Sequence, residues 1–241
     1  MNYFSLIFII FFCLSCNNIN LEDKVINDLG LKKENLKTSL ISSSVSPINN
    51  QETIIIIPEI ENEEIDCCFE LNSHILIVDT KTGNIKNKYF ESTKTNGWSS
   101  DILTLSSIVI ETTAYKIAKN KNAFGIKVKH SSSAQASPYH DTNITLFTIH
   151  NNTLKKVLKN YDIQKYSDDR NTNCSGKKTS TEKTLTTTSS LTNGLYDIIV
   201  KTKTTTTKKN KDLQGNCTNT LASSLTRSVL KYNGKRYKKA P

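Results

Sequence analysis

The sequence predicts a mainly β protein made of antiparallel sheets, sandwich-like or propeller-fragment-like, with a short N-terminal tether that is helical or disordered. Three observations favour this class. The β-branched and aromatic residues Ile, Val, Thr and Tyr are plentiful after residue 67, and they suit pleated, half-buried surfaces. Apolar and polar residues alternate there in short runs. Turn signals such as Asn-Gly separate the runs.

Several runs carry the strand pattern in detail. Ile75–Val78 and Ile85–Phe90 flank a turn in which Gly83 supplies a positive φ. Alternation is clean over residues 124–129 and 144–149, and Asn233-Gly234 closes the last hairpin. Further strands are expected at Thr53–Ile57 (stopped by Pro58), Leu103–Tyr115, Thr153–Leu158, Thr179–Ser190, Leu195–Lys203 and Ser228–Tyr232.

The predicted strands repeat weakly along the chain. Residues 123–129 and the hairpin 143–158 parallel residues 195–203 and the hairpin 227–239. Two such units could pack as a sandwich or resemble propeller blades. A closed propeller takes about 40–45 residues per blade and at least about four blades, more than this chain provides comfortably. We therefore expect one compact antiparallel domain at residues 67–241.

The first sixteen residues predict an export signal. Residues 3–14 are almost wholly apolar, and the run ends at Leu14-Ser15-Cys16. It is shorter than the roughly 20 residues of a transmembrane helix and has the length of a signal-peptide core. The pattern resembles the bacterial lipoprotein signal, which implies lipid attached to Cys16. An ordinary cleaved signal and an uncleaved anchor are the alternatives.

The lipoprotein resemblance sets the expected organisation and location. Residues 1–15 are the signal peptide, and residues 16–66 are the lipidated N-terminus and tether, with one short helix that Gly30 ends. Cys13 stands where that signal usually has an aliphatic residue, and no Lys or Arg precedes the apolar run. Asn17 after the cysteine favours the outer membrane. The lipid on Cys16 makes the membrane one partner.

Charge is distributed unevenly between the two segments. Residues 17–66 hold four lysines against ten acidic residues, whereas residues 67–241 hold 28 basic against 12 acidic residues. The positive charge of residues 67–241 is typical of nucleic-acid-binding proteins. An exported protein, however, is exposed to other polyanions instead. An anionic envelope polymer or a protein partner is therefore expected, and nucleic acid is not. The alternative is that the lysines form a solvated coat that also protects sheet edges.

The cysteines of an exported chain predict a disulfide. Cys174 and Cys217 lie in polar, turn-like surroundings beside the same pair of predicted strands, and we expect them to pair. Cys67 and Cys68 form a possible second redox pair, or remain free, or exchange with the other two. Two adjacent cysteines and two distant ones do not match the paired spacing of zinc sites.

Candidate chemistry is sparse, and no motif indicates a metal or a cofactor. His130, His140, Asp141 and neighbouring serines spell a Ser–His–Asp set, but such sets are recognised by geometry and there is no G-x-S-x-G elbow. Residues 169–173 begin like a calcium loop and then depart from it at Cys174. No catalytic residue is therefore predicted. Trp98 is expected in the core rather than on a binding platform.

Threonine-rich runs offer a second binding feature. Residues 184–192 and 202–207 are rich in Thr. Their hydroxyls could face a glycan or an ice-like surface. The plainer interpretation is the solvated face of antiparallel strands.

Several short motifs carry a family resemblance over residues 69–239: Leu71-Asn72-Ser73, Ile77-Val78-Asp79, Lys94-Thr95-Asn96-Gly97-Trp98, Ala123-Phe124-Gly125-Ile126, Thr172-Asn173-Cys174, Thr192–Ile198 and Tyr232-Asn233-Gly234-Lys235-Arg236-Tyr237. The chain thereby resembles an uncharacterised family of bacterial exported proteins and lipoproteins. Its closing motif is similar to a Y-D-G-x-x-Y ending, with Asn233 in place of Asp. The resemblance implies fold and location and no established activity.

The sequence therefore predicts an exported, lipid-anchored envelope protein that binds something without catalysis. Two alternatives stay open. One is an immunity or inhibitor lipoprotein that blocks a toxin or lytic enzyme. The other is a hydrolase of an envelope polymer, which would need a pocket with convergent carboxylates or histidines.

Overall fold

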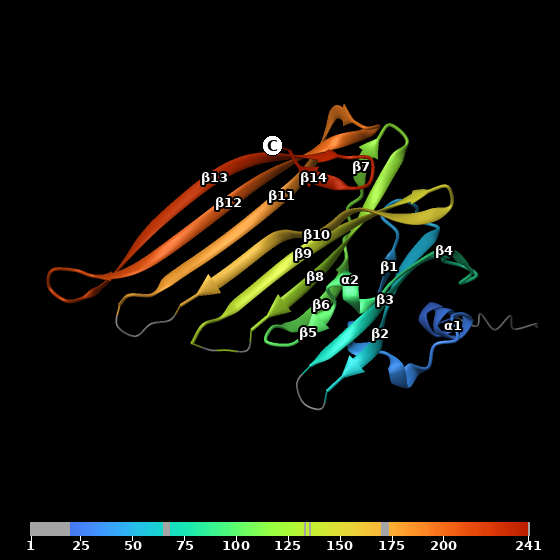
Figure 1. Cartoon of the computed structure of the whole chain (residues 1–241), viewed down its shortest axis with the longest axis horizontal. Coiled ribbons are helices and arrows are strands. Elements are labelled where there is room, and N and C mark those ends of the chain that lie inside the picture. The colour runs from blue at the N-terminus through green and yellow to red at the C-terminus, as the bar shows by residue number, and fades with distance from the viewer. Residues whose placement is uncertain (1–19, 65–67, 133, 135, 170–173, 241) are drawn as a thin grey trace, which may run out of the picture.

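The computed structural model describes residues 20–64, 68–132, 134, 136–169 and 174–240, and the chain forms two antiparallel sheets (Figure 1). The smaller sheet has the order β1-β2-β3-β4, with β5 beside β3. The larger sheet has the order β14-β13-β12-β11-β10-β9-β8-β6, with β7 beside β8. The expected mainly β class is confirmed.

The elements follow one another with short connections. The helices are α1 (Leu21–Asp28) and α2 (Thr93–Asn96), and 3₁₀ turns cover Lys33–Asn35 and Thr38–Leu40. The smaller sheet contains β1 (Ser42–Val45), β2 (Glu52–Glu63), β3 (Phe69–Asp79), β4 (Ile85–Glu91) and β5 (Ser99–Ser100). The larger sheet contains β6 (Thr104–Ile110), β7 (Tyr115–Ala118), β8 (Lys121–Ser131), β9 (Tyr139–His150), β10 (Thr153–Asp168), β11 (Lys177–Thr192), β12 (Leu195–Lys211), β13 (Cys217–Tyr232) and β14 (Tyr237–Lys239).

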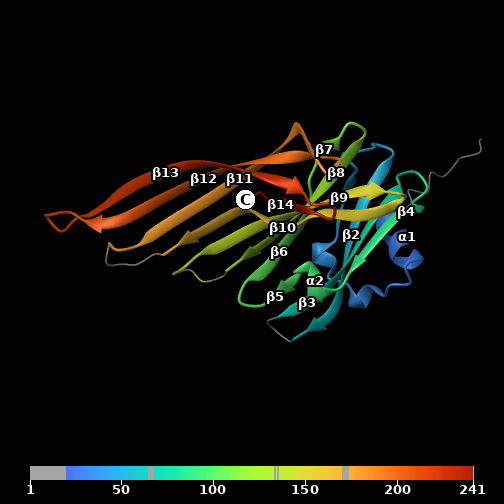
Figure 2. The ribbon, with the colours of Figure 1, turned by 45° about the horizontal axis from the view of Figure 1, so that its top comes forward.

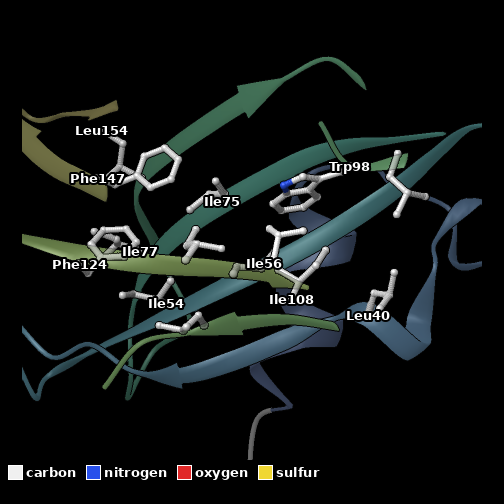
Figure 3. Close-up of a cluster of buried hydrophobic side chains, with 14 of the residues drawn as sticks. Leu40, Ile54, Ile56, Ile75, Ile77, Trp98, Ile108, Phe124, Phe147 and Leu154 are labelled. Carbon is white, nitrogen blue, oxygen red and sulfur yellow. The ribbon is translucent and has the colours of Figure 1, made fainter. Parts of the chain in front are cut away.

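The main core lies between the two sheets. Alternate residues of β2 and β3, such as Ile54, Ile56 and Ile75, face alternate residues of β8 and β9, such as Phe124 and Phe147 (Figure 3). The rings of Phe124 and Phe147 stack with centroids 5.7 Å apart. Period-two alternation thus places one face of each sheet in the core. Trp98 lies in this core, as the sequence predicts.

A second core fills the inside of the larger sheet, which curls into half a barrel (Figure 1). Ile144 and Leu146 of β9 pack there with Ile198 and Val200 of β12. Strand β7 lies against β11 and β12, and its Ile117 joins the same core. The curl allows strands distant in the sheet to share one apolar cluster.

The third core corrects the extent of the expected tether. Val25 and Ile26 of α1 pack on the outer face of the smaller sheet against Ile55 and Ile57. Strand β2 is hydrogen-bonded to β3 along almost its whole length. A boundary at residue 66 would divide this sheet, so residues from Leu21 onward belong to the folded unit. The free energy gained by burying four consecutive isoleucines, Ile54–Ile57, exceeds the cost of keeping the acidic segment after them next to the folded unit.

Polar contacts also join the two sheets. Lys156 of β10 forms an ion pair with Glu91 of β4, and both side chains are almost buried. The Asn160 amide donates to the Asn96 carbonyl over 3.0 Å, and Asn96 in turn donates to the Leu71 carbonyl over 2.8 Å. Breaking such a buried pair would leave a charge unpaired, so these contacts fix how the sheets sit on each other.

Two further expectations are corrected. The repeated units do not form two packed sheets, because β10 pairs with β11 and joins both units into one sheet. Pro58 does not stop its strand, since β2 runs on to Glu63. The partner strand β1 reaches only Ile56. Pro58 therefore lies where β2 has a strand on one side only, a position that tolerates the missing N–H.

The predicted helix and turns are confirmed. Asn20 caps α1 through its side-chain oxygen, and Gly30 follows the helix with φ 67°. Gly83 closes the β3–β4 turn with φ 69°. Asn151 and Asn152 both have positive φ between β9 and β10, as a tight hairpin requires.

Candidate binding surface

The predicted cysteine sites are described only in part. Cys174 and Cys217 form the expected disulfide, with Cα atoms 5.4 Å apart. Cys68 is also disulfide-bonded. Cys16 and Cys67 lie outside the described residues, so lipidation stays a prediction.

The histidines occupy separate places and form no catalytic set among the described residues. His130 Nδ1 lies 3.5 Å from Asp141 Oδ1, but Ser132 Oγ accepts a hydrogen bond from the Ala134 amide instead. His140 stacks on Tyr166, with centroids 4.7 Å apart. Burial and nearby Lys129 lower the pKa of His140. A Ser–His–Asp site therefore gains no support from the geometry.

Metal and membrane-spanning features are likewise missing from the described part of the chain. No group of three or more His, Cys, Asp or Glu side chains converges there. The calcium-like run falls largely on residues 170–173, which lie outside that part. Neither described helix is long and apolar enough to cross a bilayer.

The most distinctive surface is a three-stranded extension of the larger sheet, here defined as residues 177–184 of β11, 201–211 of β12 and 217–228 of β13. None of these residues is buried on either face. They include nine basic residues and one acidic residue, Glu182. Figure 2 shows the extension reaching well beyond the smaller sheet. The disulfide joins residues at the far end of this extension.

One face of the extension is almost entirely hydroxyl groups and lysines, and we name it the hydroxyl face. The register aligns Thr181 with Thr204 and Ser224 across the three strands, and the Thr181 and Thr204 hydroxyls lie 3.3 Å apart. Since side chains alternate along each strand, Asn210, Thr218 and Ser228 lie on this face at the ends of the extension, and twelve further residues of the face are aligned across all three strands. They are Lys177, Thr179, Thr181, Lys183, Thr202, Thr204, Thr206, Lys208, Thr220, Ala222, Ser224 and Thr226.

The opposite face has a different composition. It carries six basic residues, Lys178, Lys201, Lys203, Lys209, Lys211 and Arg227, together with Glu182. It also presents two exposed leucines of β13, Leu221 and Leu225, which are 69% and 79% exposed. Ser180, Thr184, Thr205, Thr207 and Ser223 also lie on this face, so it differs from the hydroxyl face in its greater charge and its exposed leucines rather than in lacking hydroxyls.

The hydroxyl face leads into a cavity at the base of the extension. Lys183 lines this cavity, whose volume is about 450 Å³. Its other walls come from β8, β10, β11 and the segment around β7: Glu111, Thr113, Ala114, Tyr115, Lys127, Ile163, Thr184, Leu185, Thr186 and Thr187. The Lys183 ammonium also lies 4.8 Å from the ring centroid of Tyr161. The face and the cavity therefore form one continuous surface.

A polar cluster organises one wall of the cavity. The Tyr115 hydroxyl donates to Glu111 Oε2 over 2.6 Å, and Lys127 Nζ lies 2.7 Å from Glu111 Oε1. Burial raises the pKa of Tyr115, and Glu111 raises it further. Tyr115 therefore stays a neutral hydrogen-bond donor at physiological pH.

Gly125 makes room for this cluster. A Cβ atom at Gly125 would lie 2.8 Å from Glu111 Oε2 and 2.8 Å from Ile144 Cδ1. The Glu111 amide also donates to the Gly125 carbonyl over 2.8 Å. A glycine inside a strand often marks such a close approach.

The cavity fits binding better than hydrolysis. Glu111 is the one carboxylate in its lining, and both carboxylate oxygens are engaged by Tyr115 and Lys127. Hydrolysis of a glycosidic bond ordinarily needs two carboxylates flanking the bond. The lining instead supplies the Lys183 ammonium group and several hydroxyls, which suit an anionic and hydroxyl-bearing ligand, while the Lys127 ammonium is paired with Glu111.

No protein-family model, curated protein or solved structure matches this chain. The resemblance to exported lipoproteins therefore stays a prediction.

The sequence did not single out the cavity residues Glu111, Tyr115, Lys127 and Lys183. One signal was present: a glycine, Gly125, lies inside the alternating run of β8. That glycine could have pointed to a close backbone approach, although not to the residue that makes it. The Thr-rich runs are visible in the sequence, but the face that they share depends on the register of β12 against β11 and β13.

Proposed function

We propose that this chain is an exported envelope lipoprotein, anchored through Cys16 in the outer membrane, that binds an anionic, hydroxyl-bearing polymer such as an acidic glycan. The polymer lies along the hydroxyl face and reaches the cavity at its base. The observation that carries this proposal is the alignment of eight hydroxyl residues and three lysines on one exposed face.

The spacing of the lysines favours a polymer over a single small ion. Lys177 pairs with Lys208 at the outer end of the face. Lys183 lies six residues along β11, which is about 20 Å at the rise of a strand. A polymer with anionic groups at intervals would reach both ends, while the threonines between them bond to its hydroxyls. Catalysis is not part of this proposal.

The polymer proposal is tested with purified protein and polygalacturonate, with neutral dextran as the reference ligand. Replacing Lys177, Lys183 and Lys208 with Gln is expected to weaken polygalacturonate binding about tenfold or more, and wild-type affinity should fall steeply with salt. The matched control replaces Lys178, Lys201 and Lys203 with Gln on the opposite face. It removes the same charge and should weaken binding less than about threefold.

The outcomes separate the hypotheses. Equal losses in the two triple variants would show that total charge, rather than the hydroxyl face, drives binding. Affinity that does not change with salt, or equal affinity for dextran, would also contradict the proposal.

The anchor is tested separately. Replacing Cys16 with Ser should abolish lipid labelling and release the chain from membranes. Unchanged membrane association would contradict lipid anchoring while leaving export and polymer binding open.

A further inference from the structure

The outer edge of β13 is open over most of its length. Strand β14 pairs only with Leu230–Tyr232, and the Ala240 amide donates a hydrogen bond to the Val229 carbonyl. Within the described part of the chain, no strand pairs with the other side of residues 217–228. In this twelve-residue segment every second residue directs its backbone N–H and C=O away from β12, and these unpaired donors and acceptors are a template for another strand.

This edge lacks the usual protection against pairing. Proteins blunt exposed edges with lysines, proline or bulges. Residues 217–228 contain one charged residue, Arg227, and no proline, and the pairing of β12 with β13 shows no bulge. The edge strand β4, by contrast, is short and carries Lys86, Lys88 and Glu91. The lysines of the extension lie mainly on β11 and β12 instead.

We propose that the occupant of this edge is β13 of a second copy of the chain, paired antiparallel about a twofold axis at Ser223. In this register Leu221 lies opposite Leu225 of the second copy, and Leu225 lies opposite Leu221. Arg227 lies opposite Asn219, so no like charges face each other. The pattern of the strand is thus complementary to itself, as a twofold interface requires.

The positive charge of the extension does not oppose this pairing strongly. The two β12 strands, which carry most of the lysines, are separated by three interstrand spacings, or about 14 Å. That distance exceeds the screening length of about 8 Å at physiological ionic strength. Cross-strand leucine pairs and the backbone ladder supply the attraction.

The shape of the molecule permits the dimer. The extension projects away from the smaller sheet and α1 (Figure 2). Antiparallel pairing places the two folded bodies at opposite ends of the paired extensions. The shared ladder spans residues 218–228, because Cys217 would lie opposite Val229, whose carbonyl already accepts from the Ala240 amide, and the hairpin at residues 212–216 has to bend away from β14 of the second copy. The axis runs perpendicular to the sheet, and both hydroxyl faces then lie on the same side. The dimer is independent of polymer binding, yet it would double the width of the hydroxyl face.

Cysteine cross-linking tests the register in the full chain, purified in detergent. Ser223→Cys should form an intermolecular disulfide beyond the level of the parent chain, because the two Ser223 positions lie directly opposite. Asn219→Cys alone should not, since its two copies lie about 27 Å apart at the rise of a strand. Mixing Asn219→Cys with Arg227→Cys should give the heterodimer.

Light scattering and sedimentation test the interface without a polymer. Replacing Leu221 and Leu225 with Lys should raise the dimer Kd about tenfold or more. Leu191→Lys is the control, because Leu191 is 62% exposed and lies outside the extension. A chain that stays monomeric across the accessible concentration range, or a dimer that keeps its affinity in the double variant, would overturn the proposal. So would cross-linking of Asn219→Cys in place of Ser223→Cys.

Discussion

Strand β12 belongs to two different regions, and the transition between them falls within two residues. Val200 is buried in the half-barrel core, whereas Thr202, the next residue on the same face of the strand, is only half-buried at the start of the extension. In the body, strands are held by apolar side chains packed on both sides of the larger sheet. In the extension, they are held by the backbone ladder, by β-branched threonines and by one disulfide. The body part of these strands therefore supplies the stability, and the extension part of the same strands supplies the proposed binding surface.

The largest expected effect tests whether burial separates the two regions. Phe124→Ala removes a fully buried ring from the core between the sheets and should lower the free energy of unfolding by about 3–5 kcal/mol. Lys209→Ala, at an exposed position of β12 in the extension, should change it by less than about 0.5 kcal/mol. Urea denaturation of both variants provides the comparison. Similar losses would mean that the extension is part of the cooperative core.

The next effect concerns the disulfide of the extension. Cys174 and Cys217 are 43 residues apart in the chain, and the chain-entropy model assigns such a loop about 4 kcal/mol. Replacing both with Ser should raise amide hydrogen exchange in residues 201–211 and 217–228 by about tenfold or more. Exchange in Ile54–Ile57, which lies in the body, should stay unchanged.

This experiment has a clear contrary result. If exchange rises equally in the two regions, the disulfide stabilises the whole chain rather than the extension. The division between body and extension would then be one of exposure only.

Sequence patterns predicted the body better than the extension. Alternation located β8 and β9 because large apolar residues recur at every second position along each strand, and Asn and Gly residues marked the hairpins. Strand β13 was expected to begin at Ser228, yet it begins at Cys217. Both faces of β13 are solvated before Ser228, so its sequence there lacks the apolar–polar alternation that would predict a strand. The polar composition of the N-terminal segment predicts a tether, because the residues of β3 on which it packs are distant in sequence.

The site shows the same limit. The disulfide was predictable because two cysteines flanked the same strands. The contact of Glu111 with Tyr115 and Lys127 depends on how β7 folds over the curled sheet, and residue spacing alone does not encode that curl. The hydroxyl face needed the registers of three strands at once. A shift of one residue in any of them would turn its threonines to the opposite face.

The smallest expected effect examines the junction between the two regions, where the cavity lies. Tyr115→Phe removes the hydrogen bond to Glu111 and should lower the free energy of unfolding by about 1–2 kcal/mol at pH 7. The pKa of Tyr115 is raised in the folded state, chiefly by burial. The unfolded tyrosine ionises near about pH 10, and the folded one does not at that pH. The stabilising contribution is therefore complete below pH 10 and is lost as pH rises above it.

The wild type should accordingly lose its advantage over Tyr115→Phe by about 1 kcal/mol between pH 9 and pH 11. Urea denaturation of the two chains at these pH values measures the difference, and ionisation of the other tyrosines cancels between them. A difference that stays constant with pH would mean that Tyr115 is solvated in the folded chain. The cavity would then be an open surface continuous with the extension, and the boundary between the two regions would move inward to Ile163 and Leu185.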